Sequence, residues 1–229
     1  MSIFTIHKNL DILQKKIHSY EKIYHRPAHS VCLLAVSKHQ PIEKIQEAID
    51  AGQFLFAENY LQEAIPKISH FSNQNLEWHF IGSIQRNKTK KIAELFSWVH
   101  TIADPLIAKR LNDQRPLELP PLNICLQVNV SCDPAKSGLS ITEIAHLANY
   151  CALLPRLKLR GLMTILSQTT DFTEQRTEFK KLYTLYKTLR KKWSEIDTLS
   201  MGMSEDLQAA IAEGATIVRI GTKFFGKRN

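Results

Sequence analysis

The sequence lacks any apolar run long enough to cross a membrane, and its N-terminus lacks the apolar segment and cleavage site of a signal peptide. Its four cysteines show no CxxC spacing, which excludes a recognisable zinc pattern and a disulfide framework. Two of them, Cys32 and Cys125, fall inside apolar runs, where cysteine usually acts as a small buried hydrophobe. The simplest expectation is a reduced, cytoplasmic location.

Acidic residues are outnumbered, since 22 Asp and Glu face 30 Lys and Arg and leave a net charge of +8. Basic residues cluster at 86–91, 190–192 and 223–228. The aromatic side chains do not interleave with these clusters as a stacking platform for nucleic acid would need. We therefore expect a diffuse attraction to anions, phosphorylated ligands included, and no specific nucleic-acid partner.

The Gly-rich dinucleotide fingerprint is also missing after the first apolar run, which counts against a Rossmann fold. What the chain does have is eight strand-like runs that alternate with stretches of helical period. Eight such units favour a closed, parallel (β/α)₈ barrel of the TIM type over an open α/β sheet. The predicted strands span residues 32–37, 54–57, 77–81, 98–102, 123–130, 158–163, 198–201 and 216–220.

The length of 229 residues is at the short end of the range for this barrel, so we expect a single domain over residues 1–229. An extra helix is predicted over residues 3–24, in a segment 1–25 that packs on the barrel and ends at Arg26-Pro27. Gly52 and Gly214 each follow an amphipathic stretch and each precede a strand. Both are predicted to end a helix as C′ residues, and the similarity suits a repeated β/α unit.

Lys38 ends the first apolar run, so the predicted barrel places its amine at the rim where active sites of such barrels form. An amine held there can lose its proton near neutral pH and condense with an aldehyde. The loops after the seventh and eighth strands often bind phosphate in this fold. Here these loops contain Ser204 and the pair Gly221-Thr222, so the three segments together suggest pyridoxal phosphate.

Several of these side chains also have a simpler structural interpretation. Ser204 precedes a predicted helix and by itself is more typical of an N-cap. Arg219 by itself suggests a buried ion-pair partner, and His79 suggests a satisfied barrel histidine more than a polar contact near the rim. Asn59 and Tyr60 are candidate caps of the helix that follows the second strand.

Eight short motifs follow one another over nearly the whole chain. They are AVSK at 35–38, ENYLQE at 58–63, WHFIGSIQRNK at 78–88, QVNVS at 127–131, KSG at 136–138, LRGLM at 159–163, LSMGMS at 199–204 and VRIGT at 218–222. In this order they resemble the pyridoxal phosphate homeostasis protein family, whose fold is that of the alanine racemase N-terminal barrel.

This resemblance implies pyridoxal 5′-phosphate as the cofactor, with Lys38 carrying it as a reversible Schiff base and Arg219 facing its pyridine nitrogen. It implies that the phosphate lies against the two glycine-containing loops, and it makes Lys136 a candidate for cofactor handling. The cofactor-binding residues predicted in this way are Lys38, Asn59, Met203, Ser204, Arg219, Gly221 and Thr222.

The same resemblance favours binding without turnover, so no catalytic residue is predicted. An arginine beside the pyridine nitrogen makes the ring a weaker electron sink. The related racemases take a second base, a tyrosine, from an added C-terminal domain, whereas this sequence ends soon after its eighth strand. We expect a monomeric carrier for vitamin B6 homeostasis with recipient enzymes as partners, and no metal. The alternative is a small pyridoxal phosphate-dependent amino-acid racemase or lyase that uses Lys38 as its base.

Overall fold

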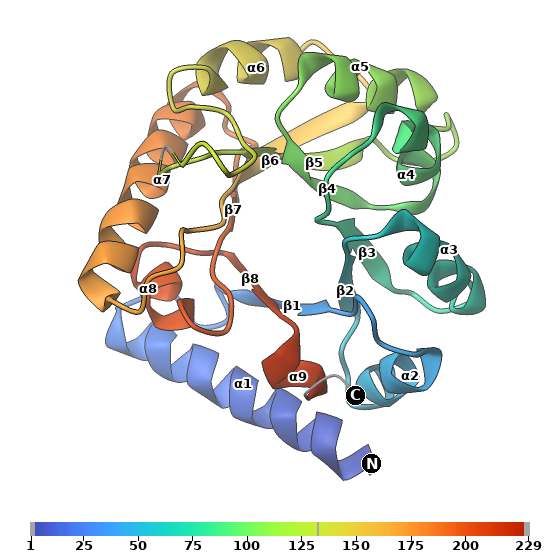
Figure 1. The fold of residues 1–229 in the computed structure, drawn as a ribbon, viewed down its shortest axis with the longest axis vertical. Helices are drawn as coiled ribbons and strands as arrows, with labels where there is room; N and C mark the ends of the chain where they lie inside the picture. Colours follow the sequence, from blue (N-terminus) through green and yellow to red (C-terminus); the bar gives the residue numbers. More distant parts are fainter. Residues whose placement is uncertain (1–2, 132, 227–229) are drawn as a thin grey trace.

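Eight parallel strands pair in chain order and close into one barrel, because β1 (Cys32–Val36) also pairs with β8 (Ile217–Ile220) (Figure 1). The computed structural model describes residues 3–131 and 133–226. The predicted barrel is confirmed. The other strands are β2 (Leu55–Glu58), β3 (Glu77–Phe80), β4 (Trp98–Ile102), β5 (Leu122–Gln127), β6 (Leu157–Met163) and β7 (Thr198–Ser200).

Helices surround the barrel on the outside (Figure 1). They are α1 (Ile3–Ile23), α2 (Ile42–Asp50), α3 (Leu61–His70), α4 (Thr89–Leu95), α5 (Pro105–Gln114), α6 (Ile144–Cys151), α7 (Phe172–Lys192), α8 (Leu207–Ala212) and α9 (Thr222–Phe225), with one 3₁₀ turn, η1 (Arg86–Lys88). No helix in the described part of the chain combines the length and the apolar character that a membrane span requires.

The predicted opening helix is present as α1, and it lies against α2, α8 and α9 (Figure 1). Its buried side chains Ile6, Leu10, Leu13 and Ile17 recur every three or four residues and therefore form one stripe. Arg26, just after α1, donates to the carbonyl oxygens of the α8 end and of the turn that follows it.

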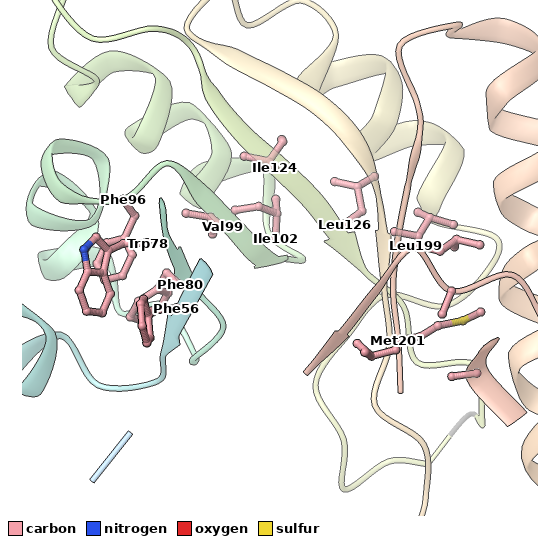
Figure 2. Close-up of a cluster of buried hydrophobic side chains, with 14 of the residues drawn as sticks. Phe56, Trp78, Phe80, Phe96, Val99, Ile102, Ile124, Leu126, Leu199 and Met201 are labelled. Carbon is pink, nitrogen blue, oxygen red and sulfur yellow. The ribbon is translucent and has the colours of Figure 1, made fainter. Parts of the chain in front are cut away.

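The main core lies between the strands and the helices, because alternate side chains of each strand point out of the barrel. Figure 2 shows Phe56, Trp78, Phe80 and Phe96 gathered in this layer beside β2 and β3. The rings of Phe80 and Phe96 lie 5.2 Å apart and meet edge to face. Further along, Val99, Ile124, Leu126 and Leu199 continue the same layer.

The barrel interior is lined differently from this outer core. Leu34, Val36, Ala57 and Ile217 form one small apolar cluster, and Trp98, Cys125 and Met163 form a second. Other inward positions of β3, β4, β7 and β8 carry polar side chains, which are described with the site. The interior of the barrel is therefore only partly apolar.

Gly52 and Gly214 end α2 and α8 in the same way, as predicted. Their φ angles are +95° and +98°, in the left-handed region that favours glycine. After α2, the Gly52 N–H bonds the Ile49 carbonyl and the Gln53 N–H bonds the Ala48 carbonyl. The same pair of bonds follows α8, so both helices end in a Schellman motif.

Two expectations need correction. The fifth strand was predicted to reach residue 130, but β5 ends at Gln127, and Val128 pairs with Leu139 across an isolated bridge. Cys32 is exposed, because it is the first residue of β1 and lies at the open amino-terminal end of the barrel. Cys125 is buried as predicted, while Cys132 lies outside the described residues.

Candidate functional site

Lys38 follows β1 at the carboxyl-terminal end of the barrel, two residues after Val36. Leu34 and Val36 belong to the interior cluster, and Lys38 lies in the turn that follows them. Its side chain is half-buried. The structure therefore puts this lysine at the rim, where the sequence predicted it.

A buried ion pair lies directly behind the Lys38 turn. The Lys67 ammonium donates to Glu58 Oε1 at 2.7 Å and to the Ser37 carbonyl at 2.8 Å. The Ser37 hydroxyl donates to the same Glu58 oxygen at 2.6 Å. Burial raises the pKa of the Glu58 carboxyl, and the Lys67 charge opposes that shift. These contacts fix the residue that precedes Lys38 to β2 and α3.

Arg219 occupies the inward face of β8 and is only 5% exposed. Its two terminal nitrogens donate to Ser200 Oγ and to the Thr164 carbonyl, each at 2.8 Å. Burial lowers the pKa of the guanidinium to about 10, so it stays charged at neutral pH. β8 pairs with β1, with Arg219 opposite Leu34, four residues before Lys38, so Arg219 lies deeper in the barrel than Lys38.

The loops after β7 and β8 are tied to each other. The Arg219 N–H bonds the Gly202 carbonyl at 2.9 Å. Lys223 donates to the Ser204 carbonyl at 2.8 Å and pairs with Glu205 at 2.9 Å. The two loops that were predicted to hold phosphate are thus neighbours in the structure, beside β1.

The remaining predicted residues are distributed around this rim. Gly221 occupies the N-cap position of α9, and Thr222 is exposed at its first residue. Met203 is 39% exposed, and its N–H donates to Asp206. Asn59 follows β2, and its amide oxygen is buried without a hydrogen-bond partner among the described residues.

The structure decides between several of the alternative interpretations. Ser204 is not an N-cap, because α8 begins at Leu207 with Asp206 before it. Asn59 and Tyr60 make no side-chain cap of α3. His79 is a satisfied barrel histidine, since both ring nitrogens are hydrogen-bonded and the residue is 1% exposed.

Lys136 lies in the loop after β5. Its ammonium donates to the Ile165 carbonyl at 3.3 Å, and partial burial lowers the pKa of this amine. The Asn129 side chain donates to the Asp133 carbonyl at 2.7 Å and so shapes the same loop. No cluster of three His, Cys, Asp or Glu side chains suited to a metal ion occurs in the described part of the chain.

The sequence reasoning missed His100 and Ser200 as neighbours of Arg219. His100 Nδ1 lies 2.8 Å from Ser200 Oγ, and its Nε2 lies 2.9 Å from His79 Nδ1. Their inward parity on β4 and β7 is readable from the sequence. Their contact is not, because it exists only across the closed barrel.

Comparison with known proteins adds to this geometry. The profile of the family described as the alanine racemase N-terminal domain matches residues 9–229. The chain is 50% identical over 229 residues to the pyridoxal phosphate homeostasis protein of Vibrio alginolyticus, and 98% of each chain is covered.

Two solved structures are similar as well. PipY of Synechococcus elongatus with pyridoxal phosphate bound matches with a TM-score of 0.84 and 33% identity, over 96% of this chain and 100% of PipY. The alanine racemase of Corynebacterium glutamicum matches with a TM-score of 0.73 and 15% identity, over 99% of this chain and 62% of the racemase. The second match is a likeness of fold alone.

Proposed function

Since this chain belongs to the alanine racemase N-terminal domain family, and within it to the pyridoxal phosphate homeostasis proteins, we propose that it binds pyridoxal 5′-phosphate and holds it without turnover. The proposed role is that of a cytoplasmic carrier, which takes up the free aldehyde and releases it to recipient enzymes. The cofactor bound to PipY, a relative at 33% identity, supports this proposal.

One observation carries the proposal. Lys38 follows β1 and Arg219 lies on β8, which pairs with β1, beside two linked glycine-containing loops. An amine and a buried guanidinium in this arrangement suit a ligand with an aldehyde at one end of a ring and an acceptor nitrogen in it.

The other donors fit the same ligand. The loop of Ser204 and the start of α9 at Gly221 and Thr222 offer hydroxyl groups and backbone N–H groups to a phosphate. The Asn59 amide oxygen is buried without a donor among the described residues, which suits the hydroxyl group on the pyridoxal ring. Met203 would cover the ligand from the same loop as Ser204.

When bound, pyridoxal phosphate supplies an aldehyde that condenses with an amine, releasing one water, and that is freed again by hydrolysis. In this proposal Lys38 holds the ligand through that reversible bond, and the glycine-containing loops hold its phosphate. Because Ser37 is fixed by Glu58 and Lys67, the amine of the next residue is presented from a rigid support.

Arg219 favours holding over turnover. It carries its proton at neutral pH and donates hydrogen bonds, so it does not protonate the ring nitrogen. An unprotonated ring withdraws electrons more weakly than a protonated one, so it stabilises a carbanion less. A carrier that releases its ligand intact is the function that this arrangement supports best.

The test combines a spectrum, a chemical trap and an assay. Purified protein incubated with pyridoxal phosphate should gain a visible band, and borohydride should remove the band and leave a reduced adduct on the peptide that contains Lys38. Lys38→Ala should form neither, whereas Lys15→Ala, an exposed lysine on α1, should behave as the unmodified protein. Absence of the band would overturn cofactor binding. Reproducible turnover of an amino acid that is lost in Lys38→Ala would instead favour the racemase or lyase.

A further inference from the structure

Five polar side chains form a linear hydrogen-bond network across the interior of the barrel. Arg219 donates to Ser200 Oγ at 2.8 Å, and Ser200 Oγ lies 2.8 Å from His100 Nδ1. His100 Nε2 lies 2.9 Å from His79 Nδ1, and His79 Nε2 lies 2.9 Å from Glu77 Oε1. The first four are buried, but the Glu77 side chain is 42% exposed at the start of β3. The network therefore runs from the ligand rim to the opposite, amino-terminal end of the barrel.

The Glu77 carboxylate determines which atom carries each hydrogen in this network. Glu77 only accepts, so His79 carries its hydrogen on Nε2, and its Nδ1 accepts from His100 Nε2–H. His100 Nδ1 then accepts from the Ser200 hydroxyl, which leaves the lone pairs of Ser200 for Arg219. The reverse direction would need an imidazolium at His79, and burial opposes that.

Charge and burial agree with these assignments. Burial lowers the pKa of His79 and lowers that of His100 further, so both rings are neutral at neutral pH. The hydrogen bond from His79 lowers the pKa of Glu77, which is therefore ionised. No carboxylate among the described residues forms a salt bridge with Arg219. The charge of Asp206 acts on the guanidinium from a distance, and Glu77 is linked to it through four hydrogen bonds.

We propose that Glu77, His79, His100 and Ser200 are positioning residues that orient Arg219 from inside the barrel and so set its contact with the ring nitrogen of the ligand. Arg219 is then held in one orientation before the ligand arrives, with its second nitrogen on the Thr164 carbonyl. The ligand half of this inference depends on the proposed function, whereas the chain of hydrogen bonds does not.

The hydrogen-bond network is tested first, on protein without cofactor. ¹⁵N spectra of histidine-labelled protein at neutral pH should show two buried neutral rings, both with the hydrogen on Nε2, and His79→Gln and His100→Asn should identify them. A ring at either position that is charged or that carries its hydrogen on Nδ1 would overturn the proposal. This result is independent of whether the protein binds pyridoxal phosphate.

The coupling is tested at the far end of the barrel. Glu77→Gln keeps the shape of the side chain and removes its charge, and we expect it to shift the visible band of bound pyridoxal phosphate and weaken binding about two- to threefold. Glu195→Gln is the matched control, because this exposed carboxylate lies before β7, at the same end of the barrel, and outside the network. It should change neither quantity, and equal effects of the two variants would contradict the coupling.

A second variant changes a residue within the network. His100→Asn keeps an acceptor for Ser200 but breaks the link to His79, and it should shift the band in the same direction with about three- to tenfold weaker binding. Val99→Ala removes buried volume from the outward face of the same strand and should leave the band in place. If Val99→Ala reproduces the shift, the effect is loss of stability and the proposal fails. If unmodified protein takes up no cofactor, the proposed function fails. The ¹⁵N result still shows whether the hydrogen-bond network exists.

Discussion

Lys67 is a buried cation whose main role is to neutralise Glu58. The two side chains are 8% and 0% exposed and lie 2.7 Å apart. Lys67→Met leaves a buried carboxylate with no cation at that distance, so we expect a loss of about 3–5 kcal/mol in the free energy of unfolding. Urea unfolding measures this loss, and Lys67→Met with Glu58→Gln should recover a large part of it.

The loss in Lys67→Met should also depend on pH. The pKa of Glu58 is raised in the folded protein by burial, and removal of the opposing Lys67 charge raises it further. A carboxyl whose pKa is higher in the folded than in the unfolded state lowers stability as pH rises from the unfolded pKa to the folded pKa. The destabilisation should therefore be smaller at about pH 5 than at about pH 8. Equal losses at both pH values would mean that Glu58 is not the group responsible.

Cys32 differs from the buried thiols of this protein. It is exposed at the amino-terminal end of the barrel, while burial raises the pKa of Cys151 to about 12 and raises that of Cys125 above the usual range. In folded Cys132→Ser protein, iodoacetamide should therefore modify Cys32 alone. Partial burial, with Glu77 and Glu21 nearby, also raises the pKa of Cys32, so its alkylation rate should level off at a higher pH than that of a free thiol. Modification of Cys125 at a similar rate would contradict the closed barrel.

At the scale of elements, the two Schellman ends provide a matched pair of substitutions. A Cβ at Gly52 would meet nothing within 4 Å, but a Cβ at Gly214 would lie 2.8 Å from the Tyr183 ring. Gly52→Ala should cost about 1–2 kcal/mol for its left-handed backbone alone. Gly214→Ala should cost about 1 kcal/mol more, because the ring must move. Urea unfolding compares them, and Tyr183→Ala should remove the difference if the ring is its cause.

The elements themselves were readable from the sequence because each reflects local pattern. The strand run at residues 32–37 and the helix ends at Gly52 and Gly214 depend on neighbours in the chain. The end of β5 was predicted three residues too far, since Val128 is as apolar as the strand before it but pairs with Leu139 instead. Local hydrophobicity does not record which partner a residue finds.

At the scale of the molecule, closure of the barrel creates contacts that no local pattern contains. The placement of Lys38 at the rim and of the two loops beside it follows from strand order alone, so the sequence predicted it. The hydrogen-bond network from Arg219 to Glu77 spans four strands, and His100 and Ser200, which are in contact, are 100 residues apart in the sequence. Each of its residues by itself looks like an ordinary polar residue, so only the closed structure reveals the network.

Ligand binding at this rim should stabilise the whole barrel. At a pyridoxal phosphate concentration of about 100 times the Kd, binding contributes about 2.7 kcal/mol. For a chain of 229 residues this raises Tm by about 5–10 °C, which a thermal melt with and without ligand measures. Pyridoxal without its phosphate should give a smaller shift, because the loops of Ser204 and Thr222 then have no ligand group to hold. Lys38→Ala should lose most of the shift and Lys15→Ala should keep it. A full shift in Lys38→Ala would mean that the ligand stabilises the protein from another site.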